Sequence, residues 1–392
     1  MKSSTKITAL LLAVLMAFSA IIAAGCSLDK QWAYKSGDKE QAIGVYLYEL
    51  NVAYGKAQSF AKDQLGDDYS TASSDWLDKE ITDDDGNKAV AREWIKQQAE
   101  KACIEFFAYE QAIKELGATV DQAALEAAES QAKEYWNVGP YASYGYLSPY
   151  KDTLEPYGIS FDSYSYCTAN YSVNYSTLFA ALYEEGGTQE VKDSELVDYV
   201  NEKYTSYSYF KVDLFESTTD EAGESSNVAL SDDKIKELEK KFNGYVKDID
   251  GGKSFDDVVE AYMKDSGLTE SPATTNTEKT ENISAGDEIK AAVEKLKNNK
   301  AAVVKVGEGE NAIMYIVFKS DIKKVSEDYV QQNRASLLSD YKEKDFKAYI
   351  EEYAKKVEYE KGSSVDGYDP VMFFVKVEPT TTAESASTED EA

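Results

Sequence analysis

The sequence contains no histidine among its 392 residues. This absence removes most general-base triads, zinc sites of the HExxH type and metal centres that use imidazole ligands. Any chemistry would have to use carboxylates, tyrosines or lysines. No phosphate-binding loop, nucleophile elbow or metal-ligating cluster stands out either. We therefore predict no metal and no cofactor, and we assign no catalytic residue.

Cysteine is scarce, and the chain has only Cys26, Cys103 and Cys167. The last two lie in aromatic-rich segments with helical patterns. They could form one disulfide in an extracellular compartment, or they could remain buried thiols, since thiols pack well in protein cores. The sequence leaves both alternatives open.

Long apolar runs are lacking except at the N-terminus. Lys2 and Lys6 precede an uncharged apolar run from Ile7 to Ile22, and small residues then lead directly to Cys26. This pattern is typical of a secretory signal and is too short to span a bilayer comfortably. No later segment of the sequence is long and apolar enough to be transmembrane.

Small residues directly before a cysteine resemble the signal of a bacterial lipoprotein. The resemblance implies that residues 1–25 are removed, that Cys26 is acylated, and that residues 26–37 form a tether. Two or three acyl chains, at ~0.8 kcal/mol per buried CH2, would anchor the chain stably. Ala23 departs from the leucine that is usual at its position, and the alternative is an ordinary secretory signal that leaves Cys26 as a thiol.

Basic residues are too few to balance the acidic ones. The 42 Lys and Arg face 72 Asp and Glu, which gives a formal net charge of −30. Such a chain repels nucleic acid and anionic lipid. We therefore predict no nucleic-acid partner, and we expect either high solubility or basic partners.

Tyrosine is abundant, with 30 Tyr against 14 Phe and 4 Trp. Tyrosine combines a large contact area, few rotatable bonds and a polar tip, so it suits wet surfaces that must bind other molecules. Most rings between residues 141 and 175 are explained by packing. Four in a loop-like stretch are candidates for contact with a client polypeptide: Tyr141, Tyr144, Tyr146 and Tyr150.

Apolar residues at steps of three and four predict a helical first half. The predicted helices cover residues 38–66, 89–116, a segment capped by Thr119 that ends near 136, and a segment capped by Ser160 that ends near 182. The string DDDGNK at 83–88 does not match a calcium loop, because its glycine directly follows three aspartates. We predict a solvated hairpin or turn there.

The second half mixes strands and helices in a definite order. The string YSYFKVDLF at 207–215 alternates like a half-buried strand, with Asp213 in an unexpected place. It is followed by helices capped by Ser231 and Ser254 and by a polar linker at 269–282. A helix at 286–298 and strands at 302–306 and 312–318 come next. A loop is predicted at 217–227, a long helix at 326–357, and a strand-like run at 371–377 before an acidic tail.

This order resembles the SurA/PrsA class of extracytoplasmic foldases, and more closely the tyrosine-rich clostridial lipoproteins with a SurA-like N-terminal domain. The strings that carry the resemblance are ELVDYVNEKYTSYSYFKVDLF (195–215), GKSFDDVVEAYMKDSG (252–267) and AVVKVGEGENAIMYIVFK (302–319). It implies a predominantly helical α+β fold, in which a small antiparallel parvulin-like sheet, flanked by helices, is inserted into a helical chaperone-like domain. The implied regions are a SurA-like helical domain (38–190), a degenerate parvulin-like domain (191–325), a returning helix (326–360), a strand-like segment (361–378) and a disordered acidic tail (379–392).

The chain departs from the family at the catalytic groove. Parvulins place one histidine on the first strand and another on the last, and these positions map to Asp213 and Tyr315. One hypothesis is that Tyr315 hydrogen-bonds to Asp213 across adjacent strands. The alternative is that Asp213 faces solvent and pairs at most with Lys211.

The resemblance implies a foldase-like lipoprotein that binds unfolded exported proteins on the extracytoplasmic face of the cell membrane, in a bacterium of the Gram-positive type. Since both family histidines are absent, we expect weak or no prolyl isomerase activity. Two alternatives stay open, an active peptidyl-prolyl cis-trans isomerase with a histidine-free groove and an envelope scaffold lipoprotein. The sequence also leaves open whether the chain forms a homodimer.

Overall fold

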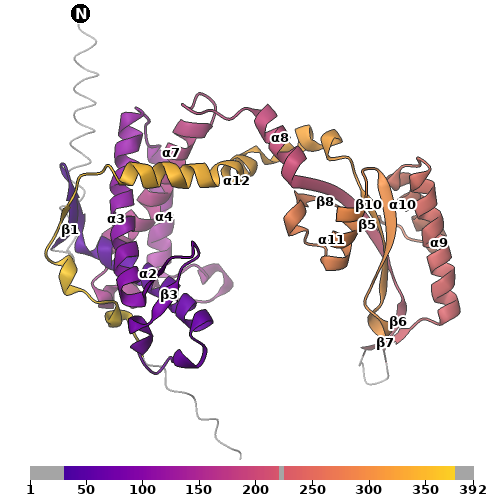
Figure 1. Cartoon of the computed structure of the whole chain (residues 1–392), viewed down its shortest axis with the longest axis horizontal. Coiled ribbons are helices and arrows are strands. Elements are labelled where there is room, and N and C mark those ends of the chain that lie inside the picture. The colour runs from indigo at the N-terminus through magenta and orange to yellow at the C-terminus, as the bar shows by residue number, and fades with distance from the viewer. Residues whose placement is uncertain (1–30, 220–224, 376–392) are drawn as a thin grey trace, which may run out of the picture. The chain divides into compact units, whose positions relative to one another are not determined.

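The computed structural model describes residues 31–219 and 225–375. The chain forms two compact units. Unit 1 comprises Met1–Gln189 with Lys344–Ala392, and unit 2 comprises Glu190–Glu343. Unit 1 is mostly helical, whereas unit 2 contains an antiparallel sheet flanked by helices (Figure 1). The predicted class, α+β and predominantly helical, is confirmed.

Two long helices form the core of unit 1. α2 (Ile43–Gln64) and α3 (Ala91–Glu115) pack side by side (Figure 1). Both carry fully buried alanines, such as Ala57 and Ala99, and the distance between packed helices depends on the size of the side chains at the contact. The other helices of unit 1 are α4 (Gln122–Asn137), α5 (Tyr150–Leu154), α6 (Phe161–Ser165) and α7 (Tyr171–Tyr183).

The helix predicted from Ser160 onward is interrupted by a π-helical turn. Ser160 caps its start as predicted, because the Ser160 hydroxyl accepts a hydrogen bond from the Ser163 backbone N–H at 3.2 Å. The π-helical turn, Tyr166–Asn170, separates α6 from α7. Such turns occur frequently at functional sites, and this one places Cys167 in the core of unit 1.

Two terminal segments differ from their predicted structures. β1 (Trp32–Ser36) lies inside the predicted tether and pairs with β2 (Lys39–Ala42) and β11 (Glu360–Lys361). The β1–β2 register shifts near Trp32, so the buried side chains of β1 do not alternate and the strand leaves no clear pattern in the sequence. The described part of the predicted strand at 371–377 is a 3₁₀ turn, Pro370–Phe373, and proline favours such a start because its φ is fixed.

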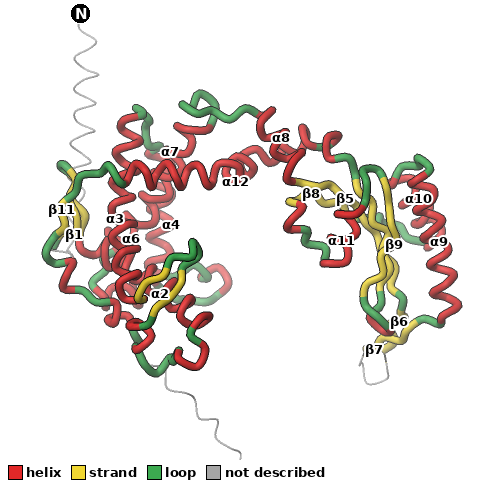
Figure 2. The backbone as a smooth tube through the Cα atoms, in the orientation of Figure 1, coloured by secondary structure: helices red, strands yellow, loops and turns green. Residues whose placement is uncertain are grey.

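A four-stranded antiparallel sheet forms the centre of unit 2, with the order β8-β5-β10-β9 (Figure 2). One face packs on α9 (Asp232–Asp250) and α10 (Phe255–Ser266), and the other packs on α11 (Asp287–Lys295). Ser231 and Ser254 cap α9 and α10 as predicted. The remaining elements are α8 (Asp193–Lys203), β5 (Tyr204–Asp213), β8 (Thr274–Lys279), β9 (Lys300–Val306) and β10 (Ile313–Lys319).

Two segments that were predicted to be loops contain strands. The polar linker at 269–282 includes β8, which is an edge strand of the sheet. The serine-rich loop at 217–227 contributes to a hairpin of β6 (Phe215–Thr219) and β7 (Ser225–Ala229). Most residues of this hairpin are exposed, so its sequence lacks the alternation that marks a half-buried strand.

α12 (Ser326–Ala354) begins in unit 2 and ends in unit 1. Its backbone departs from helical geometry at Asn333, where φ is −125° and ψ is 17°. In unit 2, the Asp340 carboxylate accepts hydrogen bonds from the Tyr199 hydroxyl and the Lys279 ammonium, both at 2.5 Å. These bonds fix the unit 2 part of α12 to α8 and β8.

In unit 1, a buried aromatic side chain helps to anchor the last turns of α12. Phe346 is only 2 % exposed. Its ring centroid lies 4.8 Å from that of Tyr175 and 5.2 Å from that of Phe179, both on α7. Edge-to-face contacts of this kind add to the free energy gained by burying the ring.

We expect Phe346→Ala to destabilise unit 1 by about 3–5 kcal/mol, the usual cost of removing a buried phenylalanine ring. Lys347→Ala is the matched control and should cost less than about 1 kcal/mol, because the Lys347–Asp85 ion pair is exposed. All 4 tryptophans lie in unit 1, so tryptophan fluorescence during urea unfolding reports on this unit. Equal losses for the two variants would contradict the assignment of Phe346 as the anchor.

Candidate functional site

The sheet face that packs on α11 carries both positions predicted to replace the family histidines. On β5 and β10, Lys211 pairs with Tyr315 and Asp213 pairs with Ile313. Directly paired residues of antiparallel strands point to the same face. Asp213 and Tyr315 therefore share one face of the sheet and are diagonal neighbours.

Sharing a face does not bring the two side chains into a hydrogen bond. The Asp213 carboxylate accepts a hydrogen bond from the Lys211 ammonium at 3.3 Å, and the two side chains are 43 % and 50 % exposed. The Tyr315 ring instead contacts the Tyr209 ring edge to face at 5.8 Å. Within the described residues no hydrogen bond joins Asp213 to Tyr315, so the structure has the alternative arrangement, with Asp213 paired to Lys211. The mapping of both positions to family histidines stays a prediction.

The edge strand β8 contributes polar groups to this face that sequence reasoning missed. The buried Tyr207 hydroxyl donates to the Glu278 carboxylate and accepts from the Asn276 amide at 3.1 Å. Burial, together with the neighbouring Glu278, raises the pKa of Tyr207 to about 12. The signal in the sequence was the threonine-rich string TTNTEK at 274–279, because threonine favours strands.

Three of the four candidate tyrosines are strongly exposed. Tyr141, Tyr144 and Tyr146 are 60 %, 77 % and 73 % exposed, and the adjacent Leu147 is 72 % exposed. Tyr150 differs, because its ring is half-buried and packs on Tyr135 and Tyr164. Three of the candidate tyrosines are thus available at the surface, whereas Tyr150 is part of the packing of unit 1.

The loop that carries the exposed tyrosines has a defined backbone. The Ser148 N–H donates to the Val138 carbonyl at 3.1 Å and closes the loop at its base. Gly139 has a φ of +90°, and a Cβ atom there would lie 2.4 Å from the Ser148 carbonyl oxygen. Only glycine fits this position without a shift of the backbone. From Val138 to Tyr150 the sequence has no charged residue.

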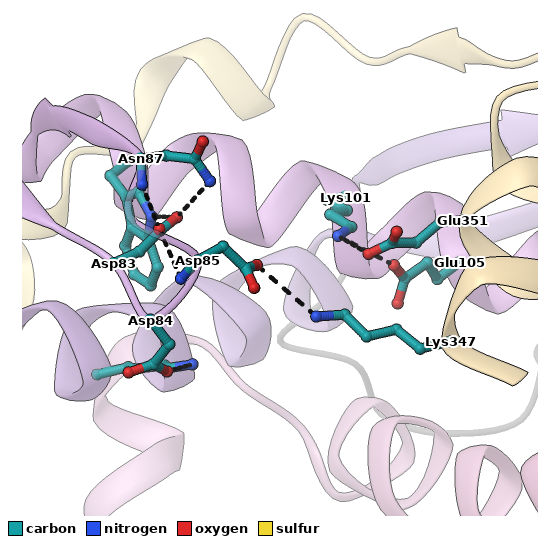
Figure 3. A network of polar contacts seen from close by, with 10 residues as sticks. Asp83, Asp84, Asp85, Asn87, Lys101, Glu105, Lys347 and Glu351 are labelled. Atoms are coloured by element: carbon teal, nitrogen blue, oxygen red, sulfur yellow. Dashed lines mark hydrogen bonds and ion pairs between the residues drawn. The ribbon is translucent and has the colours of Figure 1, made fainter. Parts of the chain in front are cut away.

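The acidic hairpin of unit 1 is a structural turn. It joins β3 (Glu80–Thr82) to β4 (Lys88–Val90). The Asp83 carboxylate accepts hydrogen bonds from the backbone N–H groups of Asn87 and Asp85 at 2.8 and 3.1 Å (Figure 3), and these bonds, led by that of Asn87, lower the pKa of Asp83. The next two aspartates form ion pairs with lysines of other elements: Asp84 with Lys56, and Asp85 with Lys347 (Figure 3). Within the described residues no three Cys, Asp or Glu side chains lie close enough to hold a metal ion.

Two buried thiols and a half-buried carboxyl group, that of Glu49, lie in unit 1. Cys103 and Cys167 are both buried thiols, so of the two alternatives the structure has the thiol form. Burial raises the pKa of Cys103 well above its ordinary value, which makes it a poor nucleophile. Burial also raises the pKa of Glu49 to about 7, the Cys167 thiol partly offsets this by hydrogen bonding, and Glu105 raises it further.

The predicted lipid attachment site, Cys26, lies outside the described residues. No helix in the described ranges is long and apolar enough to cross a membrane.

Comparisons with known proteins found similar chains among solved structures. No family model matches the chain, and no curated protein matches it. The chain is similar to structures of PrsA. It is 16 % identical to PrsA from Bacillus subtilis, with a TM-score of 0.24, and the match covers 72 % of this chain and 94 % of that one. It is 13 % identical to foldase protein PrsA from Streptococcus pneumoniae, with a TM-score of 0.28, and the match covers 76 % of this chain and 100 % of that one.

The likeness to PrsA concerns the fold alone at this level of identity. Both structures belong to the class that the order of elements in the sequence resembles, and at these TM-scores the likeness carries no further argument.

We expect Asp213→Asn and Tyr315→Phe to act independently, because no hydrogen bond joins the two side chains. Each single variant, and the double variant, should change the free energy of unfolding by less than about 0.5 kcal/mol, because both residues are half-buried and neither substitution removes a buried hydrogen bond. A double-mutant cycle from urea unfolding measures the coupling, which should be near zero. A coupling of about 1 kcal/mol or more would show that the side chains interact in solution.

We expect the pKa of Glu49 to make unit 1 less stable as pH rises. The folded state keeps the Glu49 proton from the ordinary value of 4.5 up to about 7, whereas the unfolded state loses it near 4.5. The stabilisation by the protonated form is therefore complete below pH 4.5 and is lost as pH rises through about 7.

The isosteric variant Glu49→Gln removes this titration and can still accept the Cys167 hydrogen bond. Well above pH 7 it should be more stable than the unaltered chain by on the order of 1–3 kcal/mol, and below pH 4.5 the two should be equally stable. Urea unfolding followed by tryptophan fluorescence at both pH values checks this. A difference that does not depend on pH would show that Glu49 has an ordinary pKa.

Proposed function

We propose that this protein is a lipid-anchored extracytoplasmic chaperone that binds unfolded exported polypeptides and has little or no prolyl isomerase activity. The observation that carries the proposal is the closed, uncharged loop of unit 1 with its exposed Tyr141, Tyr144, Tyr146 and Leu147. Charged residues make up 29 % of the chain, so thirteen consecutive uncharged positions, 138–150, form a distinct surface.

The side chains of this loop suit the contacts that unfolded clients offer. Tyrosine rings present a large contact area at a low cost in side-chain entropy, and their hydroxyl groups tolerate water when no client is bound. The closure at Gly139 and Ser148 holds the backbone of the loop, so binding orders few additional residues. Such a surface can bind many sequences weakly, as a chaperone must.

The sheet face of unit 2 supports the proposal that isomerase activity is weak. A prolyl isomerase must lower a barrier of ~20 kcal/mol, and desolvation of the X-Pro bond is one means of doing so. Asp213 is held by Lys211 at an exposed site, and Tyr315 makes a ring contact with Tyr209. Neither residue is part of a buried polar arrangement aimed at a substrate.

The sequence pattern around Cys26 supports the membrane anchor. The basic residues, apolar run and small residues before Cys26 fit a lipoprotein signal. The acidic surface would keep the rest of the protein away from anionic lipid and would favour basic clients, with an on-rate that falls as ionic strength rises.

The deciding experiment is the refolding of an aggregation-prone secreted protein whose slow phase is limited by proline isomerisation. With the full chain in detergent micelles, we expect a higher final yield and an unchanged slow-phase rate. A faster slow phase would overturn the low-activity part of the proposal and favour the isomerase alternative. No effect on yield or rate, together with binding to a folded envelope protein, would favour the scaffold alternative.

The triple variant Tyr144→Ser, Tyr146→Ser, Leu147→Ser tests the loop itself. We expect it to weaken binding of the unfolded client by about tenfold, since exposed aromatic anchors often dominate such contacts. Val228→Ser is the control, because Val228 is also an exposed apolar residue, at 56 %, but lies on β7 of unit 2. Equal affinities of the triple variant and the control would assign client binding to another surface.

A further inference from the structure

A second candidate binding surface of unit 1 is an open groove between the start of α4 and α7, together with the turn that follows α7. Its volume is about 510 Å³, which lies within the range of pockets that bind small ligands or a few residues of a peptide. Its floor is formed by small side chains, including Ala124 of α4 and Ala180 of α7. Both alanines are exposed, so the groove is accessible from solvent.

The walls of the groove are held in place by local hydrogen bonds. At the α4 end, the Asp121 carboxylate caps the helix and accepts from the Ala123 N–H at 2.9 Å. At the α7 end, the Thr188 N–H donates to the Ala181 carbonyl at 3.1 Å and closes the turn after the helix. Gly187 sits inside that turn, where a Cβ atom would lie 2.6 Å from the Leu182 carbonyl oxygen. A preformed groove loses little conformational entropy on binding.

The charged residues that line the groove are all acidic. Asp121, Glu184 and Glu185 are among the residues that line it, and none of the lining residues is lysine or arginine. Glu185 is exposed at the rim. Carboxylates around an apolar floor attract a ligand that carries positive charges beside an apolar group.

We propose that this groove binds short extended segments of client polypeptide in which an apolar side chain is flanked by lysine or arginine. The apolar side chain lies on the alanine floor, and the flanking cations lie near the three carboxylates. This inference rests on the proposed chaperone function and adds to it a preference for basic-apolar segments. The chain's own C-terminal residues do not suit the groove, because 378–392 contain five acidic residues and no basic one.

The test uses fluorescently labelled peptides and the full chain in detergent micelles. One peptide places leucine and valine between lysines, and a second has the same apolar residues between glutamates. Fluorescence anisotropy should show binding of the lysine peptide, weakening at high ionic strength, and at least about tenfold weaker binding of the glutamate peptide. Equal affinities for the two peptides would overturn the inference.

Two adjacent exposed alanines on α4 provide a matched pair of variants. Ala124 lines the groove, whereas Ala123 does not. Ala124→Trp should fill the groove and weaken binding of the lysine peptide by about tenfold or more, while Ala123→Trp should leave it unchanged. Glu185→Lys should weaken binding of the lysine peptide at low ionic strength and reduce its dependence on salt. Unchanged binding by Ala124→Trp would overturn the assignment to this groove.

Client refolding with the same variants separates the two proposals. If the unaltered chain raises the refolding yield but Ala124→Trp binds the lysine peptide normally, this inference fails and the chaperone function stands. If the chain binds the lysine peptide in the groove but gives no increase in yield, the groove is a peptide site and the chaperone proposal fails.

Discussion

Hydrogen bonds from tyrosine hydroxyls to carboxylates connect the two unusual features of this composition, 30 tyrosines and an excess of acids in a chain without histidine. A partly buried carboxylate must accept hydrogen bonds or be neutralised, and the chain has too few cations to pair every acid. The phenol groups provide donors in both units. These bonds include Tyr166 to Glu110 and Tyr359 to Glu100 in unit 1, and Tyr199 and Tyr204 to Asp340, Tyr207 to Glu278 and Tyr245 to Asp265 in unit 2.

These bonds also explain why tyrosine is used where phenylalanine would fill the same space. Tyr245 packs its ring against Phe242 in the core of unit 2, and its hydroxyl reaches the Asp265 carboxylate at 2.8 Å. That hydroxyl, with the nearby Lys241, lowers the pKa of Asp265. The Tyr245 side chain therefore buries an apolar ring and also donates a hydrogen bond to a charged carboxylate. The exposed tyrosines of the loop differ, because in the described part of the chain they have no such partner acid and they present their rings to solvent.

The elements that the sequence predicts correctly are those whose buried side chains recur at a regular spacing along the chain. α9 and α10 each bury one stripe, α2 and α3 bury residues at steps of three and four along much of their length, and Ser231 and Ser254 occupy the cap positions that serine favours. The prediction was wrong for strands whose buried side chains have no regular spacing. β1 has a shifted register, the β6–β7 hairpin is mostly exposed, and β8 is a polar edge strand. The cap of α4 was misplaced by two residues, since both Thr119 and Asp121 suit a cap and only the backbone decides between them.

The candidate site was only partly predictable for the same physical reason. A tyrosine-rich loop was evident, but whether a given ring faces solvent depends on packing partners that are distant in sequence. Tyr150 packs on Tyr164, fourteen positions later, whereas Tyr144 and Tyr146 contact no other aromatic ring among the described residues. The prediction that Asp213 and Tyr315 lie on adjacent strands is confirmed. The register makes them diagonal neighbours, however, and the Asp213 carboxylate accepts its hydrogen bond from Lys211. Within the described residues, Asp213 and Tyr315 are therefore diagonal neighbours that no hydrogen bond joins, and this geometry is the reason that the proposed function rests on the exposed loop of unit 1 and not on this pair.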